Sequence, residues 1–191
     1  IVVGTNNNRK IGQQDFSNGE EDYIEALSVV PDTSSPTGYK LTTKYSLQIA
    51  KGVKLSMPSV ADLDADTVPE IITNVGVASV KDGQLQWREG CENKSLGVLH
   101  AADLDADGIM ELINQYAIYD SHCNLLVGGG SGGNIAIADL MPSADNAAET
   151  GELVPEIAHV IGGKMGGKFQ FWKVFKTRAE DGTDKWSMNN T

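Results

Sequence analysis

The sequence predicts an all-β protein in which four-stranded antiparallel units follow one another, as in a β-propeller. Short runs rich in strand-forming residues are separated by Gly, Asn and Asp at intervals of roughly ten residues, which is typical of strands joined by turns. No long run shows the periodicity of an amphipathic helix. A nine-residue acidic phrase occurs twice, 41 residues apart, and a period near 40 residues is typical of propeller blades.

The alignment of the two acidic phrases gives the strand order of each unit. Each begins with a strand, passes through the acidic loop to two further strands, and ends with a hairpin turn and a fourth strand. The N-terminal part fits an incomplete unit of three strands. The expected blades of this single propeller segment are residues 1–58 (incomplete), 59–97, 98–133 and 134–191.

The acidic phrase is a candidate metal site. It reads DLDADTVPE over residues 62–70 and DLDADGIME over residues 103–111, so that carboxylates stand at positions 1, 3, 5 and 9 of both. Oxygen ligands at this spacing favour Ca²⁺, which accepts six to eight of them in flexible geometry. A backbone carbonyl is expected at position 7. The expected ligands are Asp62, Asp64, Asp66, Val68 and Glu70 in the first loop, and Asp103, Asp105, Asp107, Ile109 and Glu111 in the second.

A third loop is present in altered form. Its approach strand ends at Asp139, and Val154-Pro-Glu156-Ile repeats the Val68-Pro-Glu70-Ile of the first loop. The insertion between these segments, residues 141–153, lacks the acids of positions 3 and 5. Asp139 and Glu156 are therefore the candidate ligands of a third site.

Two other interpretations of the acidic phrase have to be compared with the metal site. An EF-hand requires a bidentate Glu at position 12, where this sequence has Thr73 and Asn114, and no helices flank the loops, so that interpretation fails. A solvated acidic turn without metal stays open for both loops. At position 6, Gly108 allows a positive φ, whereas the β-branched Thr67 makes it costly. The first loop is expected to bind metal more weakly or to adjust its turn.

Composition narrows the classes of partner. The net charge of −11 leaves no basic stripe to neutralise phosphates, so nucleic acid is not an expected partner. No stretch approaches the roughly 18 apolar residues of a membrane helix, so no transmembrane segment is expected. No signal peptide is visible, and the sequence starts within a strand at Ile1, so we expect a fragment of a larger chain.

Other residues with possible chemistry have simpler explanations. His100, His122 and His159 lack metal-ligand spacing and are expected to be structural. The glycine-rich segment 162–168 nearly spells a phosphate-binding loop, but a strand-like run follows it instead of a helix, so a hairpin loop is expected.

The residues of the second loop carry a family resemblance. The run from Ala102 to Leu112, followed by a strand and a hairpin, resembles the FG-GAP or VCBS-type propeller repeat of integrin α-subunits and many secreted bacterial proteins. The resemblance covers residues 59–127 best, residues 135–175 less well, and residues 1–58 only by strand order. No Phe-Gly-Gly-Ala-Pro string is present, and position 9 is Glu where integrins usually carry Asp.

The resemblance implies a function as well as a fold. It implies a calcium-binding, non-catalytic module of a secreted or cell-surface protein that mediates protein or glycan binding, or adhesion. It also implies a propeller of about seven blades, with the remainder of the propeller as a partner. One alternative is part of a secreted polysaccharide-active enzyme, similar to rhamnogalacturonan lyases, for which the candidate cations are Arg88, Lys94, Lys164 and Lys168. Another is a structural segment of a surface filament or layer.

Blade geometry predicts where a ligand binds. If strands alternate in direction, the acidic loops share one face, and the longest and most varied loops share the opposite face, where binding sites are common on rigid scaffolds. These loops are Thr5–Asp22, Arg88–Gly97, Gly128–Gly133 and Gly162–Lys168. The same geometry separates Cys91 from Cys123 by a strand length of roughly 17–20 Å, beyond the reach of a disulfide, although secreted chains often pair two cysteines. The disulfide stays open at this point.

Overall fold

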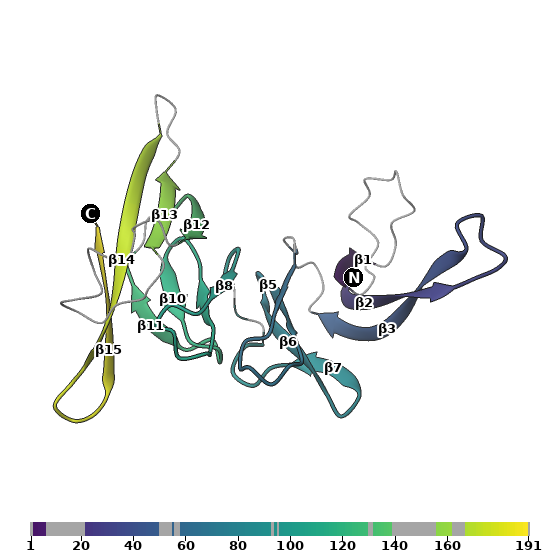
Figure 1. The fold of residues 1–191 in the computed structure, drawn as a ribbon, viewed down its shortest axis with the longest axis horizontal. Helices are drawn as coiled ribbons and strands as arrows, with labels where there is room; N and C mark the ends of the chain where they lie inside the picture. The colour runs from purple at the N-terminus through teal and green to yellow at the C-terminus, as the bar shows by residue number, and fades with distance from the viewer. Residues whose placement is uncertain are drawn as a thin grey trace. The chain divides into compact units, whose positions relative to one another are not determined.

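The structure is a computed structural model that describes residues 2–6, 22–49, 55, 58–92, 94, 96–129, 132–138, 156–161 and 167–190. Within these ranges it is all-β and contains no helix, and its strands form four antiparallel sheets (Figure 1). Strands that neighbour each other in a sheet are consecutive in the sequence. The described part of the chain therefore has no helix that could cross a membrane.

The four sheets have the numbers of strands that the sequence predicts, one with three and three with four. The first contains β1 (Val2–Asn6), β2 (Asp22–Pro31) and β3 (Tyr39–Ile49), and the second β4 (Ser59–Ala61), β5 (Glu70–Thr73), β6 (Gly76–Lys81) and β7 (Gln84–Trp87). The third contains β8 (His100–Ala102), β9 (Glu111–Ile113), β10 (Ala117–Tyr119) and β11 (Leu125–Gly128), and the fourth β12 (Asn134–Ala138), β13 (Glu156–Ile161), β14 (Lys168–Arg178) and β15 (Asp184–Asn190).

Turn chemistry fixes the strand register of the second sheet. Asp82 and Gly83 connect β6 and β7 with φ values of 54° and 75°, as a two-residue hairpin loop with two left-handed residues requires. The loop pairs Lys81 with Gln84 and, three pairs further on, Ala78 with Trp87. Arg88 extends the same ladder, because its N–H donates to the Val77 carbonyl over 2.8 Å.

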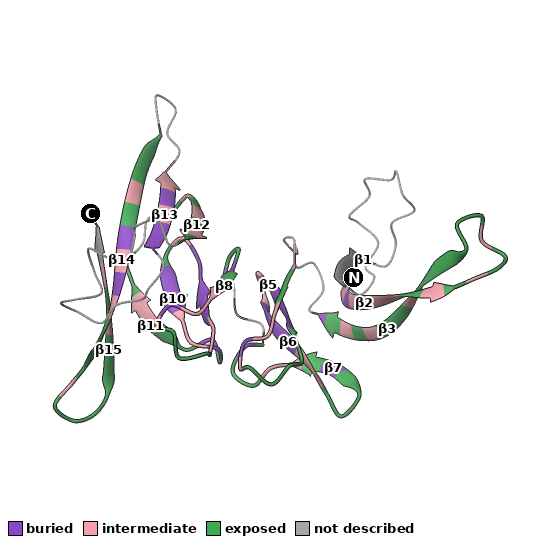
Figure 2. Ribbon diagram, in the orientation of Figure 1, coloured by how far each residue is buried: buried purple, intermediate pink, exposed green. Residues whose placement is uncertain are grey.

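The chain divides into two compact units, Ile1–Ala61 with Val68–Leu96, and Asp62–Thr67 with Gly97–Thr191. Each unit has a core to which two sheets contribute, and these cores are among the buried, purple segments of Figure 2. The first core contains Ile24, Ile49, Ile71, Ala78 and Leu85. The second contains Leu104, Ile113, Ile118, Ile157, Trp172 and Val174.

His159 lies inside the second unit, on β13. It is fully buried, and its ring meets Trp172 edge to face with 5.0 Å between ring centroids. Among the residues that the structure describes, neither of its ring nitrogens has a hydrogen-bond partner. Burial lowers the pKa of His159, because a charged imidazole loses its hydration there. A neutral, packed histidine fits the structural role expected for it.

Cys91 and Cys123 are both disulfide-bonded, and the sequence has no other cysteine. Both are buried. The expected separation by a strand length placed Cys91 on the blade-link side and Cys123 on the hairpin side, and the disulfide contradicts it. Residues 88–91 instead form a turn in which the Cys91 N–H donates to the Arg88 carbonyl, and the Cys91 carbonyl packs against Gly76, where an added Cβ would lie 2.2 Å away.

Candidate metal centres

The two acidic loops connect the first and second strands of their sheets and fold in the same way. In the first, the Asp62 carboxylate accepts hydrogen bonds from the Asp66 N–H (3.2 Å) and the Thr67 N–H (2.9 Å). In the second, the Asp103 carboxylate accepts from the Asp107 N–H (3.2 Å) and the Gly108 N–H (2.9 Å). In each loop the carboxylate of the aspartate at position 1 therefore stabilises the turn by accepting the N–H groups of positions 5 and 6.

Both loops use left-handed backbone at positions 4 and 6. The φ values are 59° and 72° at Ala65 and Thr67, and 57° and 90° at Ala106 and Gly108. The first loop thus keeps the shared turn despite its β-branched residue, and the alternative that it adjusts its turn is wrong. The left-handed alanines at position 4 are not evident from the sequence, since alanine does not favour this conformation.

Three carboxylates come together in each loop. In the first, oxygens of Asp62, Asp64 and Asp66 lie within 4.8 Å of one another, and in the second, oxygens of Asp103, Asp105 and Glu111 do so. Such a set of carboxylates fits a hard divalent cation, which offsets their mutual repulsion. The two groups share positions 1 and 3, whereas the third member is at position 5 in one loop and position 9 in the other.

The remaining expected ligands lie outside these groups. Asp107 Oδ1 accepts a hydrogen bond from the Ile109 N–H over 2.8 Å, so this carboxylate stabilises the backbone turn of its own loop. Glu70 is 2% exposed at the start of β5. The carbonyls of Val68 and Ile109 stay predicted ligands.

Glu70 forms a buried ion pair that the sequence did not reveal. Arg88 Nη1 lies 3.4 Å from Glu70 Oε1, and the Arg88 side chain is 9% exposed. The register of β5, β6 and β7 places the two residues on the same face of the sheet, because paired residues share a face and residues two apart return to it. The Asp82-Gly83 hairpin signal sets this register, so the pair could have been predicted from the sequence.

Glu111 occupies position 9 of the second loop in a different environment. Its Oε2 accepts a hydrogen bond from the Leu104 N–H over 2.8 Å, and it is 5% exposed. Burial raises its pKa to about 7 against the opposing effect of that hydrogen bond, and the nearby charges of Asp105, Asp107 and Asp103 raise it further.

Lys176 reaches the second loop from β14. Its Nζ lies 2.5 Å from Asp105 Oδ2, 3.2 Å from Asp184 Oδ2 and 3.9 Å from Asp107 Oδ2. The pKa of Lys176 is raised, first by the hydrogen bond to Asp105 and also by the one to Asp184. Nothing in the local sequence indicates this contact, since Lys176 and Asp105 are 71 residues apart.

The two loops are also joined through their backbones. The Met110 N–H, at position 8 of the second loop, donates to the carbonyl of Leu63, at position 2 of the first, over 3.0 Å. A change in the backbone conformation of one loop can therefore alter the other loop through this hydrogen bond.

The other candidate residues are described only in part. Asp139 lies outside the described residues, and Glu156, the first residue of β13, is buried. In the described ranges, metal-ligating side chains form no third group of three. Of the four candidate cations of a lyase, Arg88 is paired with the buried Glu70, Lys94 is half-buried, Lys168 is exposed at the start of β14, and Lys164 is not described. Of the predicted binding-face loops, residues 7–21, 93, 95, 130–131 and 162–166 are likewise not described.

No family model, curated protein or solved structure matches this chain. The FG-GAP or VCBS resemblance therefore depends on the acidic loops and on the order of strands around them.

Proposed function

We propose that this chain is a calcium-binding, non-catalytic segment of a β-propeller that mediates protein or glycan binding in a secreted or cell-surface protein. The observation that carries the proposal is the shared backbone conformation of the two acidic loops. Each joins the first two strands of a four-stranded sheet and brings three carboxylates within 4.8 Å of one another.

Calcium is the cation that these ligands suit best. All grouped side chains are carboxylates, whereas zinc sites usually contain imidazole or thiolate. Magnesium demands a stricter octahedral geometry at shorter distances than calcium does. Extracellular calcium modules bind with dissociation constants of about 10⁻⁴–10⁻³ M, an affinity that keeps such loops occupied outside cells.

The propeller assignment is supported by topology and by packing. Each four-stranded sheet is a simple up-and-down meander, as propeller blades are. In each unit two sheets contribute to one hydrophobic core, as neighbouring blades do. Calcium at the loops would stiffen the connection between the first two strands of a blade and leave the opposite face free for a protein or glycan.

Calcium titration of the native chain by calorimetry, with thermal melts in Ca²⁺ and in EDTA, tests the metal part of the proposal. We expect two sites and a higher melting temperature in Ca²⁺. Asp64→Asn/Asp66→Asn should remove the first site and Asp105→Asn the second. Absence of binding, with the same melting temperature in both buffers, would contradict the proposal and leave two acidic turns without metal.

The recognition part needs a separate measurement. Glycan arrays and cell-adhesion assays with the native chain should give signals in Ca²⁺ that EDTA abolishes. The Asp64→Asn/Asp66→Asn chain is the matched control, because it keeps the loops of the opposite face but lacks one metal site. Depolymerisation of a pectic polysaccharide by the native chain would instead favour the lyase alternative.

A further inference from the structure

We infer that Lys176 is the internal cation of the second acidic loop, which neutralises the loop without metal and must leave Asp105 when a divalent cation binds. This inference rests on the proposed function, since it takes the second loop to bind metal. It assigns to one residue of β14 the control of metal affinity in a loop that is distant in the sequence.

The contact involves a carboxylate of the metal-ligand group itself. Asp105 contributes an oxygen to the group with Asp103 and Glu111, and the Lys176 ammonium lies 2.5 Å from Asp105 Oδ2. The Asp105 side chain is 9% exposed and the Lys176 side chain 30% exposed, so salt screens this partly buried ion pair less than a fully exposed one. A metal ion at the group and the ammonium on Asp105 would repel each other at short range.

The hairpin of β14 and β15 determines where Lys176 lies. Lys176 pairs with Trp186 across the hairpin, and Val174 pairs with Met188, so these four residues share one face. Val174 is in the second core, and Trp186 and Met188 pack against that core together with residues of β8–β11. The packing therefore holds the stem of Lys176 against the sheet that carries the loop.

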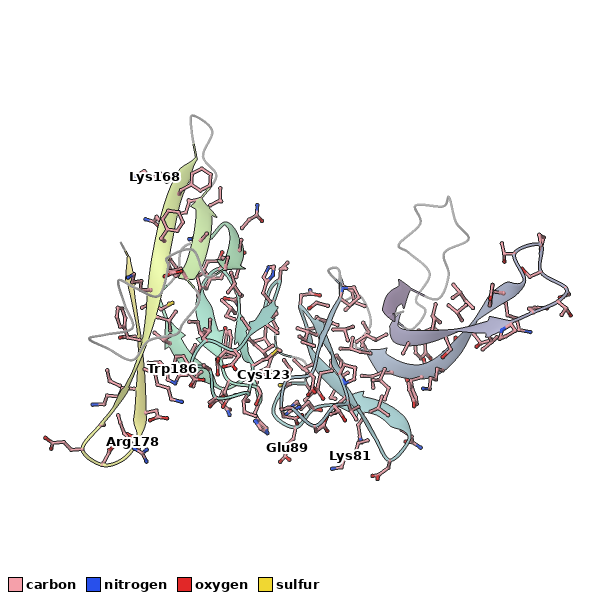
Figure 3. The ribbon with its side chains drawn as sticks, viewed as in Figure 1. Lys81, Glu89, Cys123, Lys168, Arg178 and Trp186 are labelled. Atoms are coloured by element: carbon pink, nitrogen blue, oxygen red, sulfur yellow. The ribbon has the colours of Figure 1, made fainter. Side chains whose placement is uncertain are left out.

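The ammonium has an alternative position when it leaves Asp105. Asp184 Oδ2 lies 3.2 Å from Lys176 Nζ, and the Asp184 side chain is 43% exposed at the start of β15. The Trp186 ring, labelled on β15 in Figure 3, has its centroid 5.5 Å from the same Nζ and can stabilise a cation over its face. Lys176 can thus give up one carboxylate and keep its charge compensated within its own hairpin.

The cation of the first loop is placed differently. Arg88 pairs with Glu70, which is not a member of the group formed by Asp62, Asp64 and Asp66. In the second loop the carboxylate paired with a cation is itself a member of the metal-ligand group, so a metal ion bound there competes with Lys176 directly.

Calcium calorimetry of the full chain tests the inference, in an Asp64→Asn/Asp66→Asn background that isolates the second loop. Lys176→Met should lower the dissociation constant about ten-fold or more, equivalent to about 1.4 kcal/mol. It should also lower the melting temperature in EDTA and enlarge the rise that Ca²⁺ produces. Lys185→Met is the control, because Lys185 lies on β15 of the same hairpin, is exposed and carries the same charge. It should change none of these values.

The outcomes separate the inference from the proposed function. If Lys176→Met leaves the dissociation constant of the second loop unchanged, the inference is overturned while calcium binding stands. An equal effect of Lys185→Met would also overturn it, because net charge alone would explain the result. No calcium binding by the native chain would overturn both. If Lys176→Met does not fold in EDTA, Lys176→Gln, which keeps a polar group without the charge, gives the same comparison.

Discussion

The first and second acidic loops have the same backbone and differ in what their carboxylates meet. In both, the aspartate at position 1 accepts the N–H groups of positions 5 and 6. In the first loop the glutamate of position 9 pairs with Arg88, whereas in the second the equivalent Glu111 accepts a backbone N–H and lies among three aspartates. A lysine from β14 instead meets position 3 of the second loop.

This difference shows which properties of such a loop are local. The turn depends on residues within nine positions of one another, so that two copies of the phrase fold alike. The cation that pairs with each loop depends on strands outside the loop, which bring Arg88 to one copy and Lys176 to the other. Two loops with nearly the same sequence should therefore differ in stability, pH dependence and metal affinity.

The largest effect is expected from neutralising position 9 of the first loop, and a much smaller one from the same change in the second. Glu70→Gln removes the buried carboxylate that pairs with Arg88, and breaking a buried ion pair from one side costs about 3–5 kcal/mol. Glu111→Gln keeps an oxygen that can accept the Leu104 N–H and removes a charge from beside three aspartates. In EDTA it should change the free energy of unfolding by less than about 1 kcal/mol, or raise it.

Urea unfolding of the two variants in EDTA measures this difference directly. Arg88→Met in the Glu70→Gln chain is the control, since it replaces both members of the pair and should recover part of the lost stability. Equal destabilisation by Glu70→Gln and Glu111→Gln would show that the two glutamates have equivalent surroundings. That result would contradict the different partners that the structure gives them.

A smaller effect is expected from pH. Burial raises the pKa of Glu111 to about 7 from an ordinary value of 4.5, so the folded chain holds a proton that the unfolded chain releases between these values. In EDTA the contribution of Glu111 to the free energy of unfolding should therefore be complete below pH 4.5 and be lost as the pH rises through 7, by about 3 kcal/mol at most. The Glu111→Gln chain should lack this part of the slope.

The same carboxyl group links calcium binding to proton release. A metal ion needs the ionised form, so the affinity of the second loop should rise with pH up to about 7. Calorimetry in two buffers of different ionisation enthalpy should show up to about one proton released per ion below that pH. Binding without proton release at about pH 6 would contradict the raised pKa.

The strand order could be predicted from the sequence because its signals are local. Gly, Asn and Asp between short β-rich runs indicated one three-stranded and three four-stranded units, and Asp82-Gly83 is a hairpin signal by itself. The position of the acidic loops between first and second strands followed from the same pattern. The grouping of the carboxylates did not follow from that pattern, since Asp107 and Glu70 have other partners.

The remaining properties depend on contacts between sheets. Lys176 meets Asp105 only because the fourth sheet packs on the third, and no periodicity in either segment encodes that packing. The disulfide state of Cys91 and Cys123 was open for a related reason, because the strand-length argument placed them on opposite sides of the blades, whereas the chain turns at Arg88 after β7. Contacts between side chains of different sheets could therefore be identified only from the structure.

The smallest effect is expected from exchanging position 6 between the loops. Gly108 has a φ of 90°, and none of the described residues lies within 4 Å of an added Cβ, so Gly108→Thr should mainly lose conformational energy, about 1–2 kcal/mol. Thr67→Gly should gain less, about 0.5 kcal/mol, because glycine also increases the entropy of the unfolded chain. For a chain of this length about 1 kcal/mol corresponds to a change in melting temperature of about 2–4 °C, which calorimetry in EDTA resolves. If Thr67→Gly instead lowers the melting temperature, the Thr67 side chain stabilises the turn, and the strain expected at a φ of 72° is offset within the first loop.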